Sequence, residues 1–566
     1  MKKFLIVLLS VMVCFTAFGG GGGQQSGQGG TGKAGTLADG NTTLSMFYFG
    51  GINANVTSFA YEDNAFTKRI VDETGIKLDI NSMNTADSAT RLNIMLNSGD
   101  YPDVIFSRSF NIAELDYYGT QQKIFIPLDQ YNIRQYPNVD GIMKEYPTLD
   151  IVIRGSDGKI YGMPRVNGCL HCIYRSGRAA YYMPFIRDND RKMFETYDEL
   201  ADYLRWVRDN DVNKNGNMND EIPMMWRNTD TRNAIAFFAK GFMPFIMSNE
   251  YFGMTLNGKR VVEQYREPEF RDTLRFIAGL YNEKLIIPDS FTMTNDEGRA
   301  LAYSDPPIVA VYGLTQANSM MTTNSPRWLE TFIMPVLKGK NGNRYAPNFS
   351  PWSQQSNFMS ITDKCKDPVL AIKFYEYLLS FEMQLLSNLG PQGMTWDYAD
   401  RGAVSISGGP ASWKQLSISS TGSASTNLLW MNGNWSGWYD AWRYGIQGVD
   451  MNNINRWLTT GDPSLVEGLT TNGSYNEAHN YIESLKMTPY AMPDSSFIPP
   501  LGMTDADSLR ITDIMVDFDR FLDTAMVEFI TGVRNINSDA DWNAYNTELD
   551  RLGARERATI IQKYIR

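Results

Sequence analysis

An α/β fold with a largely parallel sheet is predicted for this chain on two observations. From residue 42 onward, apolar runs of strand length alternate with segments whose apolar residues recur at helical spacing, a pattern typical of βα units. The chain has 566 residues, of which 43% are hydrophobic, so it can bury more than one core. We therefore expect two or more folded domains.

The first residues predict export. Two lysines precede an apolar run over residues 4–18, which is too short to span a membrane and is typical of a signal peptide, expected over residues 1–19. Residues 20–41 are rich in Gly, Gln and Ser, a composition that cannot bury enough surface to order itself, and predict a flexible tether. No later apolar run reaches spanning length, so we expect a soluble, exported protein in the periplasm or at the cell surface.

The first folded segment predicts three strands and two helices. The strands are short apolar or alternating runs, and Gly75 is expected to end the first helix. Two strands are expected over residues 44–51 and 76–80, and residues 98–106 are expected to form a turn and the third strand. The helices are expected over residues 63–74 and 87–98.

The later elements are mostly helical. A capping box, Thr196 to Glu199, predicts a helix start, and Asp367-Pro368 predicts another. An apolar run between Pro306 and Gly313 predicts a buried strand. The helices are expected over residues 196–209, 269–284, 367–388, 504–530 and 541–553.

The segment DVNKNGNMNDEIP, residues 211–223, has the composition of a calcium loop. Oxygen-bearing side chains recur at alternate positions, Gly216 stands sixth and permits a sharp turn, and two carboxylates close the run. Ile222 holds the position of the usual bidentate acid, so Glu221 is expected to serve one place earlier. The alternative is a polar turn without metal, but the spacing favours Ca²⁺. The predicted ligands are Asp211, Asn213, Asn215, Asn217, Asp220 and Glu221.

This loop and three other motifs resemble a known family. The others are SGDYPDV (98–104), FYEYLLSFEMQLLSNLG (374–390) and EFITGVRNI (528–536). In this order they resemble the large extracellular solute-binding proteins, family 1, which deliver oligosaccharides to ABC importers, and the resemblance runs from about Thr42 onward. It implies a two-lobed periplasmic-binding-protein-like type II fold with both lobes discontinuous in sequence. It also implies that the calcium ion is structural and lies away from the ligand.

The resemblance implies a division of the chain and a function. The expected N-terminal lobe comprises residues 42–160 plus 306–389, and the C-terminal lobe comprises residues 161–305 plus 390–566, with the calcium loop at 211–221. The implied function is capture of a carbohydrate, an oligosaccharide above all, by hinge closure, followed by delivery to an ABC permease without bond cleavage. A monomer is expected, held at the membrane only by its tether or the permease.

The family is commonly lipid-anchored through a cysteine at the end of the signal peptide. Here Phe18 stands where that cysteine is expected, and Cys14 follows Val13, a poor residue for this processing. The sequence therefore leaves both a lipid-anchored and a freely exported form open.

Candidate ligand-binding residues come from the aromatic residues and the strand ends. Aromatic residues make up 13% of the chain, and indole rings in Gly-rich loops can stack on sugar rings. Tyrosines that end strands lie where open α/β sheets bind ligands. Core packing is the alternative for the tryptophans, and an interlobe salt bridge is the alternative for the arginine. The candidates are Tyr48, Arg165, Trp226, Tyr312, Trp396, Trp435 and Trp438.

Other functions have weaker support in the sequence. The net charge of −11 and the absence of a Lys/Arg run argue against a nucleic-acid partner. Only His171 and His479 could serve a hydrolase triad, and no G-x-S-x-G motif accompanies them. Cys169 and Cys172 favour a local disulfide or free thiols over zinc. An exported glycosidase or lyase, and a binder of a peptide or other non-sugar solute, remain the alternatives.

Overall fold

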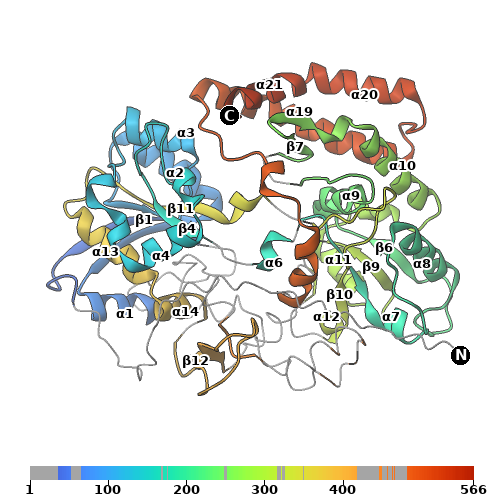
Figure 1. Ribbon diagram of the computed structural model, residues 1–566, viewed down its shortest axis with the longest axis horizontal. Helices are drawn as coiled ribbons and strands as arrows, with labels where there is room; N and C mark the ends of the chain where they lie inside the picture. The colour runs from blue at the N-terminus through green and yellow to red at the C-terminus, as the bar shows by residue number, and fades with distance from the viewer. Residues whose placement is uncertain are drawn as a thin grey trace, which may run out of the picture.

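The computed structural model describes most of the chain after the leader and places two β-sheets at opposite ends of the long axis (Figure 1). The predicted signal peptide, most of the tether, Trp435, Trp438 and Cys169 lie outside the described residues. The described residues are 36–52, 65–166, 170–174, 176–247, 251–314, 320–321, 326–347, 350–389, 391–394, 396–416, 445–448, 456, 460, 462, 465 and 481–565.

The first sheet has five strands in the order β2-β1-β3-β11-β4. Strand β1 (Thr43–Ile52) pairs in parallel with β2 (Lys77–Asn84) and with β3 (Val104–Phe106). Strand β11 (Gln355–Ile361) returns from far along the chain and runs antiparallel to both β3 and β4 (Met163–Val166). The predicted opening βα units are confirmed, with strand bounds shifted by a few residues.

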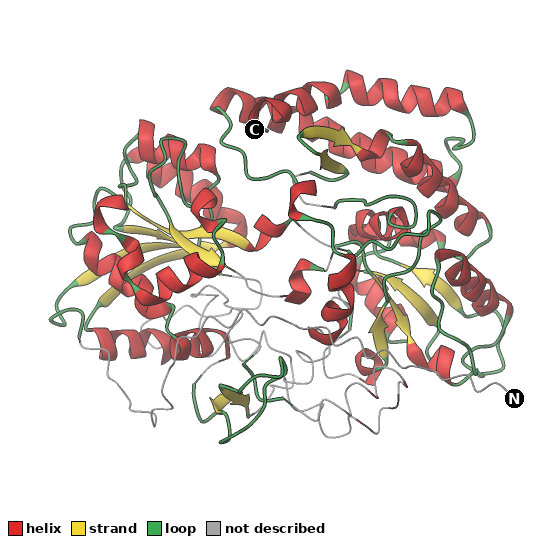
Figure 2. Cartoon of the chain, in the orientation of Figure 1, coloured by secondary structure: helices red, strands yellow, loops and turns green. Residues whose placement is uncertain are grey.

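Helices cover both faces of this sheet (Figure 2). Residues of α1, α4 and α13 pack with one face in a core around Phe106, and α2 packs on the other face around Ile105. The single helix predicted over residues 367–388 is two helices, because the chain turns at Leu379 and Ser380. The helices are α1 (Ala65–Thr74), α2 (Thr85–Ser98), α4 (Pro137–Glu145), α13 (Pro368–Leu378) and α14 (Phe381–Leu389).

The second sheet has four strands in the order β10-β5-β9-β6. Strand β9 (Val309–Gly313) runs parallel to β6 (Ile222–Met225) and antiparallel to β5 (Ala179–Tyr182), which also pairs with β10 (Thr331–Ile333).

Two predicted lobe boundaries conflict with this strand pairing. The strand expected within residues 306–313 was assigned to the first lobe, and that assignment is wrong because β9 pairs inside the second sheet. Residues from 161 were assigned to the second lobe, yet β4 pairs with β11 in the first sheet. A short buried apolar run fits either sheet equally well, so its partners are set by contacts far away in the chain.

The remaining long helices enclose the second sheet and form a layer above it in Figure 1. Helix α19 lies along α10, and Arg232 at the start of α9 makes ion pairs with Asp519 (2.9 Å) and Asp523 (2.5 Å) of α19. Helices α8 and α10 bury an apolar stripe at helical spacing, whereas α9 is buried on nearly all sides. The long helices are α8 (Tyr197–Asp209), α9 (Thr231–Ala239), α10 (Pro268–Asn282), α19 (Asp505–Thr531), α20 (Asp539–Arg551) and α21 (Ala554–Tyr564).

Shorter elements complete the described part of the chain. Two hairpins are formed by β7 (Met254–Asn257) with β8 (Arg260–Glu263) and by β12 (Trp396–Tyr398) with β13 (Trp413–Gln415). None of the helices in the described ranges is long and apolar enough to cross a membrane. The short helices are α3 (Ile112–Leu115), α5 (Leu149–Val152), α6 (Leu170–Ile173), α7 (Met183–Arg187), α11 (Asn295–Ala302) and α12 (Pro326–Leu329).

Candidate functional site

The predicted calcium loop connects α8 to β6 and winds around its own side-chain oxygens. The Asp211 carboxylate accepts hydrogen bonds from the backbone N–H groups of Asn215 (3.0 Å) and Gly216 (2.8 Å). The amide oxygens of Asn213, Asn215 and Asn217 each accept from the backbone N–H two residues later. Such turns are the local preference of Asp and Asn. Gly216 adopts φ +87°, a left-handed conformation that favours glycine.

Two carboxylate oxygens of this loop, Asp220 Oδ1 and Glu221 Oε2, are buried and accept no hydrogen bond from any described residue. Their sister oxygens are occupied: Asp220 Oδ2 accepts from Asn215 Nδ2 (2.7 Å), and Glu221 Oε1 accepts from the backbone N–H of Val212 (2.9 Å). Burial raises the pKa of Glu221, and the charge of Asp220 adds to the effect. Buried carboxylate oxygens are unfavourable unless paired, so these two suit a cation.

The donor set of the loop fits a hard cation. Within the described ranges, no three His, Cys, Asp or Glu side chains converge as a metal-binding group, so an ion here would also depend on amide oxygens. Carboxylate and amide oxygens are the ligands that Ca²⁺ prefers. The loop is anchored from outside as well, because Asn213 Nδ2 donates to the carbonyl of Pro307 (2.9 Å), just before β9.

The structure brings two of the predicted ligand residues together in the first lobe. Tyr48, in β1, is almost fully buried, and its ring lies 5.7 Å from the ring of Phe106. Arg165, in β4, is partly buried and stacks over Phe358, with its guanidinium carbon 4.6 Å from the ring centre. The rings of Phe106 and Phe358, whose centres are 5.0 Å apart, connect the two residues. An interlobe salt bridge, the alternative for Arg165, is absent among the described residues.

Two further candidates meet in the second lobe. Trp226 follows β6, and Tyr312 of β9 stands opposite Met225, the last residue of β6. Both side chains are fully buried, and neither Trp226 Nε1 nor the Tyr312 hydroxyl has a hydrogen-bond partner within the part of the chain that the structure describes. Burial raises the pKa of Tyr312. Each therefore offers an unused donor at the carboxyl end of a strand, but without accessible surface in this conformation.

Trp396 lies apart from these pairs. It is fully buried in β12, and its ring meets those of Phe381 (6.4 Å) and Tyr398 (5.8 Å) edge to face. Trp396 is therefore a core residue, which was the alternative to a ligand contact. A buried indole has no free face for a sugar ring, so Trp396 is not placed to contact a ligand here.

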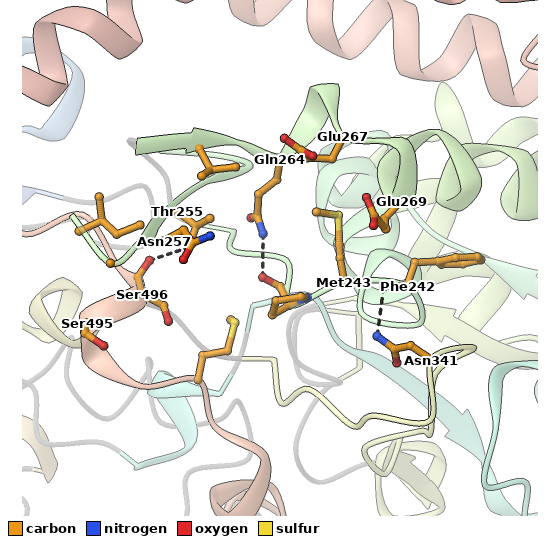
Figure 3. Close-up of a pocket in the computed structure, with 15 residues that line it drawn as sticks. Phe242, Met243, Thr255, Asn257, Gln264, Glu267, Glu269, Asn341, Ser495 and Ser496 are labelled. Atoms are coloured by element: carbon orange, nitrogen blue, oxygen red, sulfur yellow. Dashed lines mark hydrogen bonds between the residues drawn. The ribbon is translucent and has the colours of Figure 1, made fainter. Parts of the chain in front are cut away.

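A pocket with a volume of about 540 Å³ lies on the second lobe, and sequence reasoning missed it (Figure 3). Met243 and Gln264 line it, and the Gln264 amide is held by the backbone N–H of Ile246 (2.9 Å) and the carbonyl of Pro244 (2.8 Å). Glu267 and Glu269 contribute carboxylates, and its described lining has no Lys or Arg. Segments that are distant in sequence form this pocket, so no local pattern signals it.

The passages between the two sheets are held by specific contacts. Where the chain enters β5, the side chain of Asn233 accepts from the backbone N–H of Gly177 (2.7 Å) and donates to the carbonyl of Arg178 (3.1 Å). Where it returns to β11, Trp352 packs on a small cluster of Ile246, Met492 and Phe497 from the second lobe. Cys172 belongs to α6, on the passage from β4 to β5, and its side chain is not described.

Comparison with known sequences identifies two relationships. The profile of the family described as bacterial extracellular solute-binding protein matches residues 53–385. A curated relative from Streptococcus pneumoniae serotype 4, the fructooligosaccharide ABC transporter substrate-binding protein FusA, is 22% identical over 504 residues, which cover 88% of this chain and 86% of FusA.

Comparison with solved structures shows the fold. A Bifidobacterium longum infantis structure, described as an HMO-binding, ABC-transporter-associated solute-binding protein, aligns with a TM-score of 0.72 at 18% identity. An EF-hand mutant of S. pneumoniae FusA in complex with fructo-nystose aligns with a TM-score of 0.67 at 19% identity. Each alignment covers 93% of this chain and 99% of the other chain. The expected two-lobed α/β architecture is confirmed.

Proposed function

The chain belongs to the bacterial extracellular solute-binding proteins, and from this premise we propose that it is the substrate-binding component of an ABC importer for a carbohydrate. The observation that carries the proposal is the arrangement of two sheets in separate lobes, each with unused hydrogen-bond donors at the carboxyl ends of its strands. The relative FusA, named for fructooligosaccharides, supports an oligosaccharide as the ligand class.

The proposed mechanism is hinge closure. A ligand that contacts both lobes stabilises the closed form over the open form, and the permease recognises the closed shape. Tyr48 and Arg165 are the proposed contacts in the first lobe, and Trp226 and Tyr312 are those in the second. Both residues of the second lobe must gain accessible surface before a ligand can reach them. Trp435 and Trp438 stay predictions.

We propose that no bond of the ligand is broken. Membership of a solute-binding family supports this reading. The alternatives are an exported glycosidase or lyase, which would release shortened sugar, and a binder of peptides or other solutes, which would ignore glycans. The negative net charge argues against a nucleic-acid partner. Membership of the family supports the permease as the membrane-embedded partner.

A structural Ca²⁺ ion in the loop of residues 211–221 is part of the proposal. The unpartnered oxygens of Asp220 and Glu221 support it, as does the naming of an EF-hand in FusA. The two carboxylates, Asp211 and the Asn213, Asn215 and Asn217 amides would hold the ion, whose charge would offset the buried carboxylates and fix the turn into β6. Because this loop precedes β6 directly, the ion would act by positioning that strand.

Export with a cleaved leader, a monomeric state and attachment by the tether are proposed with the function. Mass spectrometry of the protein from its host distinguishes a chain that begins near Gly19 from one that carries lipid on Cys14.

Calorimetry of the mature chain against a panel of oligosaccharides tests the proposed function. We expect saturable binding of one ligand per chain, a smaller radius of gyration by X-ray scattering on binding, and recovery of the ligand intact. Shortened sugar in the recovered ligand would support the enzyme alternative. Binding of a peptide pool with no response to any glycan would reject the carbohydrate assignment.

A further inference from the structure

Arg165 lies at the carboxyl edge of the first sheet, where the chain leaves it for the second lobe. In the pairing of β4 with β11 it stands opposite Ser356. Met359, later in β11, stands opposite Phe106, the last residue of β3. Because β11 runs antiparallel to β3, Ser356 and its partner Arg165 lie beyond the carboxyl end of β3. Ligands of open α/β sheets bind at this edge.

A row of aromatic rings leads across the sheet to Arg165. The rings of Tyr48 and Phe106 lie 5.7 Å apart, and those of Phe106 and Phe358 lie 5.0 Å apart. The guanidinium carbon of Arg165 lies 4.6 Å from the centre of the Phe358 ring. Stacking of this kind orients the guanidinium plane but provides no hydrogen-bond acceptor for its N–H groups.

Arg165 has no polar partner anywhere in the described part of the chain. Its side chain makes no hydrogen bond or ion pair there, and its Nε atom is fully buried. The titratable groups around it are the hydroxyls of Tyr375 and Tyr48, which are neutral at physiological pH. The Tyr375 hydroxyl donates to the carbonyl of Pro164 (2.9 Å). Burial lowers the pKa of the guanidinium, as expected for a cation without an anion.

Two other arginines with little exposure are paired with carboxylates within the fold. Arg227 meets Asp230 at 2.6 Å, and both side chains are less than one-tenth exposed. Arg266 meets Asp550 at 2.5 Å and Glu263 at 3.1 Å. The fold thus supplies carboxylates to these cations, whereas no carboxylate of the described residues meets Arg165, which is only partly buried.

An unpaired, partly buried cation is unfavourable until an anion reaches it. A guanidinium presents parallel N–H groups that match the two oxygens of a carboxylate, whereas sugar hydroxyls accept hydrogen bonds but bring no negative charge. Resting on the proposed carbohydrate function, we propose that Arg165 binds a carboxylate of the ligand, so that the cargo is an acidic oligosaccharide containing uronic acid.

Matched ligands test this proposal. Uronic-acid oligosaccharides are titrated into the full mature chain beside the same oligosaccharides after carboxyl reduction, and beside sulfated neutral oligosaccharides. We expect at least one uronic ligand to bind about 100-fold more tightly than its reduced form, the range found when one partner of a buried charge pair is removed. Tight, Arg165-dependent binding of the sulfated sugars instead would overturn the carboxylate assignment.

Variants assign the effect to the residue. Arg165→Met should abolish the preference for the uronic ligand over its reduced form. Arg165→Lys should keep part of that preference, because lysine retains the charge but loses the paired N–H groups of the guanidinium. The control is Arg154→Met, since Arg154 in the same lobe is already paired with Asp150 and Asp129.

The outcomes separate this proposal from the function on which it rests. If uronic and reduced ligands bind equally, or if Arg165→Met and Arg165→Lys keep the wild-type preference, the carboxylate proposal fails and the sugar-binding function stands. If no glycan binds wild-type protein, the function itself fails. If Arg165→Met does not fold, Arg165→Lys decides, because an unaltered preference in that variant refutes recognition by the arginine fork.

Discussion

Arg165 in the first lobe and Lys240 in the second are both basic side chains without a carboxylate partner among the described residues, yet their surroundings differ. Lys240 caps the C-terminal end of α9, is almost fully buried, and donates to the carbonyls of Ala236 (3.1 Å) and Ser176 (3.5 Å). Arg165 has no acceptor at all among the described residues. A cation whose hydrogen bonds go to the backbone belongs to the scaffold, whereas one with none needs a partner from outside.

The position of Lys240 shows what such a scaffold cation does. Ser176 and Gly177 lead into β5, where the chain arrives from the first lobe, and a Cβ at Gly177 would collide with Lys240 Nζ. Gly177 also adopts φ +71°, so both space and backbone conformation favour glycine there. Lys240 and Asn233 therefore hold the backbone of residues 176–178 where the chain enters the second lobe.

The largest expected effect that sharpens this comparison is a pH dependence of stability from Lys240. Burial lowers its pKa from 10.5 to about 7, so between these values the unfolded chain binds a proton that the folded chain does not. Stability therefore rises with pH in this interval, by up to about 3 kcal/mol between pH 7 and 9 at about 1.4 kcal/mol per unit. Denaturant unfolding at pH 7, 8 and 9 measures the slope.

Lys240→Met should flatten that slope, since the variant has no group to titrate there. The matched control is Lys144→Met, because Lys144 is exposed and paired with Asp140 at 2.5 Å, and its loss should leave the slope as in wild type. Equal slopes in wild type and Lys240→Met would show that Lys240 remains charged in the folded protein. Lys240 would then be a buried cation like Arg165.

The calcium loop presents the opposite charge: two of its carboxylate oxygens are buried and accept no hydrogen bond from the described residues. We expect calcium at about 100 times its Kd to stabilise the protein by roughly 2.7 kcal/mol, and a chelator to lower the Tm accordingly. Asp220→Asn keeps the acceptor for Asn215 Nδ2 but removes a charge, so it should weaken the response to calcium. Thermal melts with calcium and with chelator measure this.

Asp202→Asn is the matched control for the loop, because Asp202 lies exposed on α8 beside Arg205 and close to the loop in sequence. It should retain the wild-type response. If calcium does not change the Tm of the wild-type protein, the loop does not bind the ion. It is then a turn stabilised only by its own hydrogen bonds.

The smallest expected effect is that of Arg165→Met on the ligand-free protein. Loss of stacking on Phe358 removes about 1 kcal/mol, while loss of an unpaired cation offsets it, so the unfolding free energy should stay within about 1 kcal/mol of wild type. Arg227→Met provides the contrast, because it strands the buried Asp230 and should destabilise by about 3–5 kcal/mol. A large loss in Arg165→Met would mark Arg165 as a structural residue.

Local features were predictable from short stretches of sequence. The capping box of Thr196 and Glu199, the helix that ends before Gly75, and the turns of the calcium loop all occur as expected. Each depends on hydrogen bonds or backbone conformations within a few residues, which are encoded by those residues themselves.

Long-range features were not predictable in the same way. The apolar run of β9 was expected in one sheet and pairs in the other, and Trp396 was a candidate for sugar stacking but lies in the core. The pocket beside Gln264 had no signal in the sequence. In each case the decisive neighbours come from distant parts of the chain.

The amino-acid sequence was sufficient to identify an α/β chain of an extracellular solute-binding family, its helix starts and its oxygen-rich loop, because these follow from composition, short motifs and local hydrogen bonding. Only the folded molecule could establish that Lys240 donates to backbone carbonyls, while Arg165 has no acceptor in the part of the chain that the structure describes. Whether a buried charge is satisfied depends on groups brought together across the whole chain, and no local pattern records them.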